Sequence, residues 1–176
     1  MSDAERLDVR AIWSGRVVRL SVERVRLPNG NVCELEVIRH RGAAAVVPLD
    51  EQRRVLLVRQ YRYAAGDWLL EVPAGKLDGD EPPEACALRE IEEETGMRAG
   101  RLVPMGWIWT TPGFTDERIW LYLALDLVPG RQQLQHDEVL TVERLDLAEA
   151  VERAIRGEIR DAKSAVALLR TPHYAG

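Results

Sequence analysis

Hydrophobic and polar residues alternate along the first part of the chain in the manner of half-buried strands. The alternation runs through residues 15–27 and again through 31–40, and Pro28-Asn29-Gly30 between them is a turn signal. This pattern predicts an N-terminal antiparallel β-hairpin. Short apolar runs predict further strands at residues 43–49, 54–61, 69–75, 118–127 and 139–147.

A helical pattern occupies residues 82–96, which begin with two prolines and end in Gly96. Proline suits the first helical turn and glycine suits the position after the last one. Two more helical patterns follow, at residues 147–157 and 161–170. Strands therefore surround one early helix and two late ones. This order predicts an α+β fold, an α/β/α sandwich in which helices flank a mixed β-sheet.

Composition limits the classes of function. The chain has 176 residues, enough for one compact domain, and a net charge of −5 without any run of Lys or Arg. We expect no nucleic-acid partner, because such binding needs a basic surface. No secretory signal and no membrane-spanning run are evident, so we expect a cytoplasmic protein without a membrane partner. Cys33 and Cys86 are expected to be small buried hydrophobic residues.

Three acidic side chains share one face of the predicted helix at 82–96. At about 100° per residue, Glu90, Glu93 and Glu94 lie together, whereas Glu92 points the opposite way into solvent. An apolar stripe that can dock on a sheet runs beside them and comprises Ala87, Leu88 and Ile91. Clustered carboxylates repel one another, and Mg²⁺ or Mn²⁺ would relieve that repulsion while bridging substrate phosphates.

Residues 75–97, GKLDGDEPPEACALREIEEETGM, resemble the Nudix box G-x5-E-x7-R-E-U-x-E-E-x-G-U, where U is apolar. Ile91 and Met97 fill the apolar positions. The fixed positions all match, as Gly75, Glu81, Arg89, Glu90, Glu93, Glu94 and Gly96. The resemblance implies the Nudix fold and a pyrophosphohydrolase that uses two to three Mg²⁺ (or Mn²⁺) ions per site.

The same resemblance implies roles for the residues in and beside the box. Glu90, Glu93 and Glu94 would be metal ligands, with the backbone carbonyl of Ala74 as a further ligand. Arg89 would orient a catalytic glutamate rather than bind substrate. Glu81 would lie in the loop that folds back over the metal site.

Two other segments resemble the ADP-ribose pyrophosphatase branch of that family, which acts on nucleotide sugars. Pro112 lies 16 residues after Gly96, within TTPGFTDE. Upstream, VRQYRYAAGDWLLEVPAGKLD contains a Q-x-R triplet whose arginine, Arg62, would contact the diphosphate. Arg59 is a second candidate for this contact, because a guanidinium suits phosphate oxygens.

The N-terminal strands, residues 1–40, are expected to serve dimerisation and substrate contacts, and residues 41–176 to form the hydrolase domain. This expectation follows from the resemblance, since family members are usually homodimers whose N-terminal strands complete the partner's site. Trp13 and Trp68 are candidate platforms for a base, although core packing is the expected role of any one of the five tryptophans.

The expected reaction is attack of water on one phosphorus of ADP-ribose, giving AMP and ribose 5-phosphate. Arg62 would stabilise the developing charge. The general base is open between Glu138, in the loop QQLQHDEVL, and Glu93 of the box; His136 is interpreted as a surface residue. GDP-mannose or another nucleotide sugar is an alternative substrate, and a catalytically inactive ligand-binding module is an alternative of another class.

Overall fold

The computed structural model describes residues 3–136 and 138–175. These residues form two compact units. One consists of Met1–Gly42 and Trp109–Arg118, and the other of Ala43–Ile108 and Ile119–Gly176. None of the helices in the described residues is both long and apolar enough to cross a membrane.

The first unit is a three-stranded antiparallel sheet in the order β1-β2-β3, with β1 Glu5–Ser14, β2 Val18–Arg26 and β3 Val32–His40. The expected hairpin is confirmed as β2 and β3. Its turn places Gly30 at a φ of +87°, which favours glycine. Strand β1 was not expected, although apolar Leu7, Val9, Ala11 and Trp13 occupy every second position of its sequence. All ten of its residues are exposed.

The tip of a second hairpin, residues 109–118, belongs to this same unit. Ile38 of β3 donates from its backbone N to the carbonyl of Phe114 (2.7 Å), and Asp116 accepts from the backbone N of His40 (2.8 Å) and from Arg39 (3.1 Å). Pro112 occupies the turn that Thr111 and Phe114 close with a backbone hydrogen bond, a position that suits proline. The GFTDE segment therefore fastens this hairpin tip to β3.

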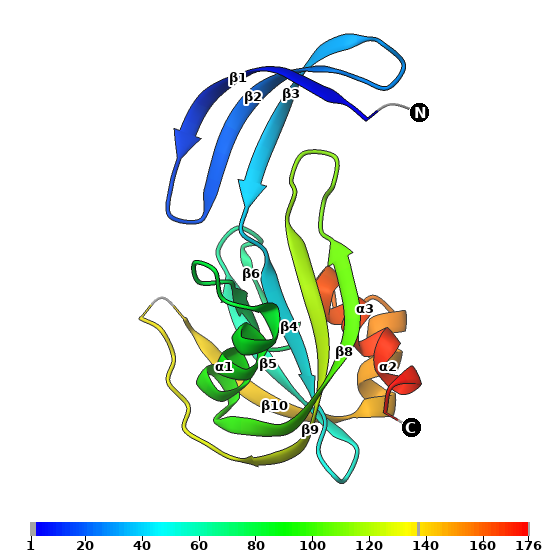
Figure 1. Cartoon of the computed structure of the whole chain (residues 1–176). Helices are drawn as coiled ribbons and strands as arrows, with labels where there is room; N and C mark the ends of the chain where they lie inside the picture. The colour runs from blue at the N-terminus through cyan, green and yellow to red at the C-terminus, as the bar shows by residue number, and fades with distance from the viewer. Residues whose placement is uncertain (1–2, 137, 176) are drawn as a thin grey trace. The chain divides into compact units, whose positions relative to one another are not determined.

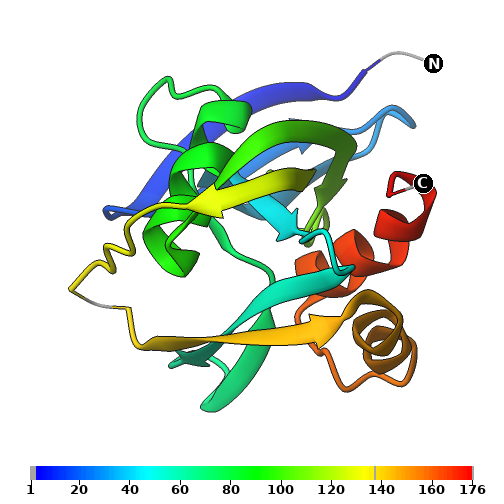
Figure 2. The same cartoon turned by 90° about the horizontal axis from the view of Figure 1, so that it is seen from below.

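The second unit contains two sheets and three helices (Figures 1 and 2). A mixed sheet has the order β7-β4-β9-β8, and an antiparallel sheet has the order β10-β5-β6. The strands are β4 Ala43–Pro48, β5 Arg54–Arg62, β6 Asp67–Glu71, β7 Ala74–Lys76, β8 Met97–Trp109, β9 Arg118–Pro129 and β10 Leu140–Asp146. The helices are α1 Pro83–Thr95, α2 Leu147–Ile155 and α3 Ala162–Arg170, with a final 3₁₀ turn at Thr171–His173.

Strand β4 runs between the two helical layers (Figure 1). Ala43, Ala45 and Val47 pack into a core with α2 and α3, and that core also contains Leu168. The alternate residues Ala44 and Val46 pack into a second core with Cys86, Ala87 and Ile91 of α1. Because successive strand residues point to opposite faces, one strand supplies both cores. This arrangement confirms the expected α/β/α sandwich.

The strand expected at residues 69–75 is divided in two. Strand β6 ends at Glu71 and belongs to the antiparallel sheet, whereas β7 starts at Ala74 and belongs to the mixed sheet. Between them Val72 donates its backbone N–H to the Ser164 hydroxyl (2.8 Å) rather than to a strand, and Pro73 has no N–H to donate. The chain therefore crosses from one sheet to the other immediately before the acidic helix.

Candidate active site

Helix α1 begins and ends where its sequence predicts. Pro82 is the N-cap and Pro83 the first helical residue, and Gly96 adopts φ +71° after the last turn. The buried stripe differs from the expected one. Leu88 is 39% exposed, and Cys86 takes its place against the sheet, fully buried. The stripe Cys86, Ala87, Glu90, Ile91 and Glu94 therefore includes two of the carboxylates.

Burial separates the glutamates of this helix into two groups. Glu90 and Glu94 are 3% and 2% exposed, whereas Glu93 lies at the edge of the site with 28% of its side chain exposed. Glu92 is half-exposed on the outer side, near Arg98. Only the inner glutamates can act on a bound ligand, because Glu92 faces away from them.

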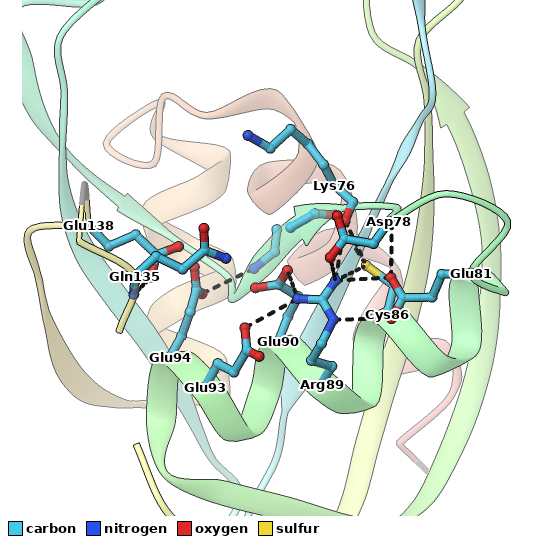
Figure 3. Close-up of polar contacts among 12 residues, drawn as sticks. Lys76, Asp78, Glu81, Cys86, Arg89, Glu90, Glu93, Glu94, Gln135 and Glu138 are labelled. Atoms are coloured by element: carbon cyan, nitrogen blue, oxygen red, sulfur yellow. Dashed lines mark hydrogen bonds and ion pairs between the residues drawn. The ribbon is translucent and has the colours of Figure 1, made fainter. Parts of the chain in front are cut away.

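Arg89 lies at the centre of the acidic residues (Figure 3). Its Nη1 donates to Glu90 Oε1 at 2.6 Å and to Glu93 Oε2 at 3.2 Å, and its Nε and Nη2 donate to the two Glu81 oxygens at 3.1 and 2.9 Å. A further bond reaches the Lys76 carbonyl at 3.2 Å. The loop that carries Glu81 is thus folded back onto the helix, and Arg89 sets the orientation of two box glutamates.

Strand β7 lies against the same carboxylates. The backbone N of Ala74 donates to Glu94 Oε2 at 3.2 Å. A Cβ on Gly75 would lie 1.6 Å from Glu90 Oε1, so only glycine leaves room for that carboxylate. The site therefore requires a residue without a side chain at position 75.

The electrostatics of the buried pair suit a cation. Burial, with the nearby charges of Glu90 and Glu138, raises the pKa of Glu94 to about 8. Burial also raises the pKa of Glu90, although Arg89 opposes the shift. Carboxylate oxygens are the ligands that Mg²⁺ and Mn²⁺ prefer, and a divalent cation would reverse this destabilisation. The donor set therefore fits a hard divalent metal ion.

The carboxylates of Glu90, Glu93 and Glu94 do not converge on a common point. In the described part of the chain, no three acidic, histidine or cysteine side chains have the arrangement of a metal site. The contacts of Arg89 explain this, because its guanidinium holds both Glu90 and Glu93.

The loop that carries Glu138 is attached to the C-terminal end of α1. Gly130 donates from its backbone N to the Gly96 carbonyl (2.8 Å), and Gln133 donates likewise to the Glu93 carbonyl (2.9 Å). The Gln132 side chain donates to the Glu94 carbonyl at 2.7 Å. These bonds satisfy carbonyls that a helix end leaves without partners.

Glu138 itself is half-buried and lies beside Glu94 in Figure 3. Its Oε2 accepts from the backbone N of Gln135 at 2.7 Å, and its charge contributes to the raised pKa of both Glu90 and Glu94. Asp137, its neighbour in the loop, lies outside the described residues. The structure thus brings Glu138 to the box carboxylates from a distant part of the chain.

The candidate substrate residues are distributed over different surfaces. Arg62 forms two bonds with Glu71, and the charge of Glu94 raises the pKa of Arg62 further, so this guanidinium lies within electrostatic reach of the acidic cluster. Arg59 is three residues away on β5, hence on the opposite face, and pairs with Glu143 at 2.5 Å. Trp68 is 43% exposed and packs edge-on against Tyr61.

Pro112 and Trp13 belong to the other unit, and the exposed Trp13 ring packs over Gly15. Of the two cysteines, Cys86 is buried as expected, but Cys33 is only half-buried in the N-terminal sheet. His136 is exposed, in agreement with its interpretation as a surface residue.

Sequence reasoning missed Glu71 and Lys163, which form an ion pair at 2.5 Å although 92 residues separate them in the chain. Glu71 is only 1% exposed. The available signal was a lone acidic residue inside the apolar run LLEVPAG, since a buried charge is found where it has partners.

Comparison with known proteins gives three concordant findings. The family model described as NUDIX domain matches residues 39–167. An ADP-ribose pyrophosphatase of Bacillus subtilis is 39% identical over 159 residues, 89% of this chain and 86% of that protein. A GDP-mannose pyrophosphatase of Cronobacter sakazakii is 35% identical over 150 residues, 76% of this chain and 78% of that protein.

A solved structure described as an ADP compounds hydrolase has the same fold. It superposes with a TM-score of 0.86 and covers 99% of this chain and 95% of its own, at 21% identity. At that identity the likeness concerns the fold alone.

Proposed function

The chain belongs to the NUDIX family and is a hydrolase, and on that premise we propose that it cleaves the diphosphate of a nucleoside-diphosphate sugar. The proposed substrate is ADP-ribose, which would give AMP and ribose 5-phosphate. The observation that carries the proposal is the buried pair Glu90 and Glu94, which faces Ala74 and Gly75 within reach of the Arg62 charge. The name of the Bacillus subtilis relative supports ADP-ribose in particular.

The proposed metal ligands are Glu90, Glu93 and Glu94 together with the Ala74 carbonyl. Two to three Mg²⁺ or Mn²⁺ ions held there would polarise a phosphoryl oxygen and lower the pKa of a bound water. Arg89 orients Glu90 and Glu93 and balances part of their charge, which supports a positioning role for it. Arg62 would bind the diphosphate oxygens and stabilise the charge that develops on them.

The proposed general base is Glu138, with Glu93 as the alternative. The carboxylate would accept a proton from water while the water oxygen bonds to one phosphorus and the bridging P–O bond breaks. The bond to the Gln135 backbone orients the Glu138 carboxylate near the box, which supports its assignment. In this scheme the leaving group is the other phosphoryl half of the substrate.

For the first unit we propose a role in homodimerisation and in substrate contacts, through Pro112 and Trp13. Trp68 and Arg59 of the second unit are further proposed contact residues. Strand β1 exposes several apolar side chains, which supports an interface with a second copy of the chain. These side chains are Leu7, Val9, Ile12 and Trp13. The acidic net charge argues against a nucleic-acid partner. The proposed location is the cytoplasm, without a membrane partner.

GDP-mannose is the second candidate substrate, because the Cronobacter sakazakii relative bears that activity in its name and no residue described above selects adenine over guanine. Phosphate release with a coupled phosphatase would compare ADP-ribose, GDP-mannose, ADP-glucose and a deoxynucleoside triphosphate, each with magnesium and with EDTA. We expect a magnesium-dependent maximum on ADP-ribose. A maximum on GDP-mannose would transfer the assignment to that substrate, and no turnover by folded protein would identify a ligand-binding module instead.

A further inference from the structure

A buried network of charged residues lies behind the proposed diphosphate contact. Glu71, the last residue of β6, is 1% exposed. Arg62 of β5 donates to it in a bidentate manner, from Nε to Oε1 and from Nη2 to Oε2, both at 2.7 Å. Lys163 of α3 donates to the same Oε2 at 2.5 Å. One buried carboxylate therefore joins a strand arginine to a helix lysine.

The network continues into the N-terminus of α3. Lys163 also pairs with Asp161 at 2.9 Å, and Asp161 caps the helix by accepting from the backbone N of Ser164 at 3.0 Å. The Ser164 hydroxyl in turn accepts from the backbone N of Val72 at 2.8 Å. Two separate bonds thus fasten the start of α3 to the end of β6, beside Glu71.

Stability alone is a weak reason for burying such a carboxylate. Desolvation of a buried ion pair offsets much of its attraction, and well-packed apolar residues stabilise a fold as well or better. The two cations nevertheless hold the pKa of Glu71 at about 2, against the effect of burial, so the group stays charged. A permanently charged, immobile acceptor is suited to fixing the direction of a guanidinium.

The two bonds to Glu71 fix the direction of the Arg62 guanidinium. Its Nε and Nη2 are used by Glu71, so its Nη1 end is directed away from Glu71. The side chain is 40% exposed, and the charge of Glu94 acts on it. An arginine held along one edge presents its remaining donors to an anion without losing further side-chain freedom.

We propose that Glu71 and Lys163 are positioning residues for the substrate diphosphate, with Glu71 orienting Arg62 and Lys163 tying Glu71 to the N-terminus of α3. This inference rests on the proposed function through Arg62. Neither Glu71 nor Lys163 contacts the substrate in this arrangement. Both act through the direction of one guanidinium.

A double-mutant cycle tests the proposal with Arg62→Ala, Glu71→Gln and the double variant. For each protein, kcat and KM on ADP-ribose, the melting temperature and calorimetric binding of inorganic pyrophosphate with magnesium would be measured. Arg160→Gln is the matched control. It removes a cation next to Asp161, but its ion pair with Asp67 is exposed and lies outside the network.

Glu71→Gln is expected to weaken pyrophosphate binding and lower kcat/KM by about 10- to 100-fold, the scale on which a misplaced positioning group costs activity. In the Arg62→Ala background, Glu71→Gln should lower kcat/KM and pyrophosphate affinity by less than about twofold, because the guanidinium that Glu71 orients is absent. Arg160→Gln should match the wild type. Losses that add in the double variant, or unchanged pyrophosphate binding by Glu71→Gln, would overturn the proposal.

The binding measurement separates this inference from the proposed function. If the wild type turns over no nucleotide sugar, the proposed function fails, while the cycle in pyrophosphate affinity still tests the orientation of Arg62. If Glu71→Gln does not fold, Lys163→Gln replaces it, since that change leaves the Arg62 pair in place. The same non-additivity with Arg62→Ala is then expected, and additive losses contradict the role of Lys163.

Discussion

Helix α1 holds five glutamates, and the four near its C-terminal end differ in how much of the side chain reaches solvent. Glu90 and Glu94 are buried, Glu93 lies at the edge and Glu92 is half-exposed. Spacing alone separated Glu92 from the others, because helical periodicity fixes which side each residue takes. It could not predict that one guanidinium contacts both Glu90 and Glu93, since side-chain torsions respond to neighbours that the sequence does not identify.

Glu94→Gln tests the inner face of this helix. If Glu94 is the metal ligand proposed above, removing its charge should lower kcat by about 100-fold or more, in line with the loss of a group that stabilises the transition state. The melting temperature in EDTA should not fall, because the buried charge is repelled by Glu90 and Glu138. Glu92→Gln on the same helix is the control and should keep wild-type kcat. Equal losses in both variants would contradict the metal assignment.

Gly75→Ala tests the close approach of β7 to Glu90. The new Cβ would overlap Glu90 Oε1, and the carboxylate can leave only by rotating its side chain. We expect the fold to remain and kcat to fall by about 100-fold, since a displaced catalytic group costs activity on that scale. Circular dichroism would establish that the variant is folded, and steady-state kinetics would measure the loss of kcat. Wild-type turnover would show that Glu90 has no role in its present position.

At the scale of elements, most strands and all three α-helices were predictable from their apolar side. The helices at 82–96, 147–157 and 161–170 correspond to α1, α2 and α3 because each buries a regular stripe. Strand β1 was not predicted, although apolar Leu7, Val9, Ala11 and Trp13 occupy every second position of its sequence. The contact between Glu71 and Lys163 escaped it because no local rule relates residues 92 positions apart.

The low pKa of Glu71 also predicts how the contact between β6 and α3 responds to acid. Its folded pKa of about 2 lies below its ordinary value of 4.5, so protonation disfavours the folded state. The ionised Glu71 carboxylate contributes about 3 kcal/mol to the free energy of unfolding. This contribution is complete above about pH 4.5 and is lost as the pH falls toward about 2. Glu71→Gln should flatten this part of the urea-unfolding profile.

The control for the acid profile is Glu158→Gln, which alters an exposed ion pair with Arg156 and should leave the profile unchanged. An acid slope in Glu71→Gln equal to that of the wild type would show that another carboxylate is responsible.

The loop at 130–138 depends on the end of α1 for its position. Gln132→Ala removes the side-chain bond to the Glu94 carbonyl and should loosen the segment that carries Glu138. We expect kcat to fall about tenfold with a smaller change in KM, because a loosened loop affects the catalytic step more than binding. Gln133→Ala is the matched control, since Gln133 is attached through its backbone N. A rise in KM alone would argue against a base on this loop.

For the whole molecule, the sequence predicted an α/β/α sandwich, but not that the segment Trp109–Arg118 groups with the N-terminal strands. The hairpin tip at Trp109–Arg118 belongs with the N-terminal sheet because Asp116 bonds to Arg39 and His40. Such long-range polar bonds leave no periodic trace in the sequence.

The oligomeric state is the prediction that belongs to this scale. Val9→Lys and Ile12→Lys place charges among the exposed apolar residues of β1. If β1 forms the dimer interface, light scattering on a sizing column should give twice the chain mass for the wild type and the monomer mass for the double variant. Arg10→Lys on the same strand is the control. A wild-type monomer would remove the proposed role of the first unit.

Strand β4 has a consequence for how this sequence can change over time. The side chains of Ala43, Ala45 and Val47 pack into the core under α2 and α3, and those of Ala44 and Val46 into the core under α1. A larger residue at one of these positions would cost about 1–3 kcal/mol by overpacking, but it would displace only one layer. Substitutions that compensate for a change in the packing of α1 can therefore arise independently of those that compensate for a change in the packing of α2 and α3.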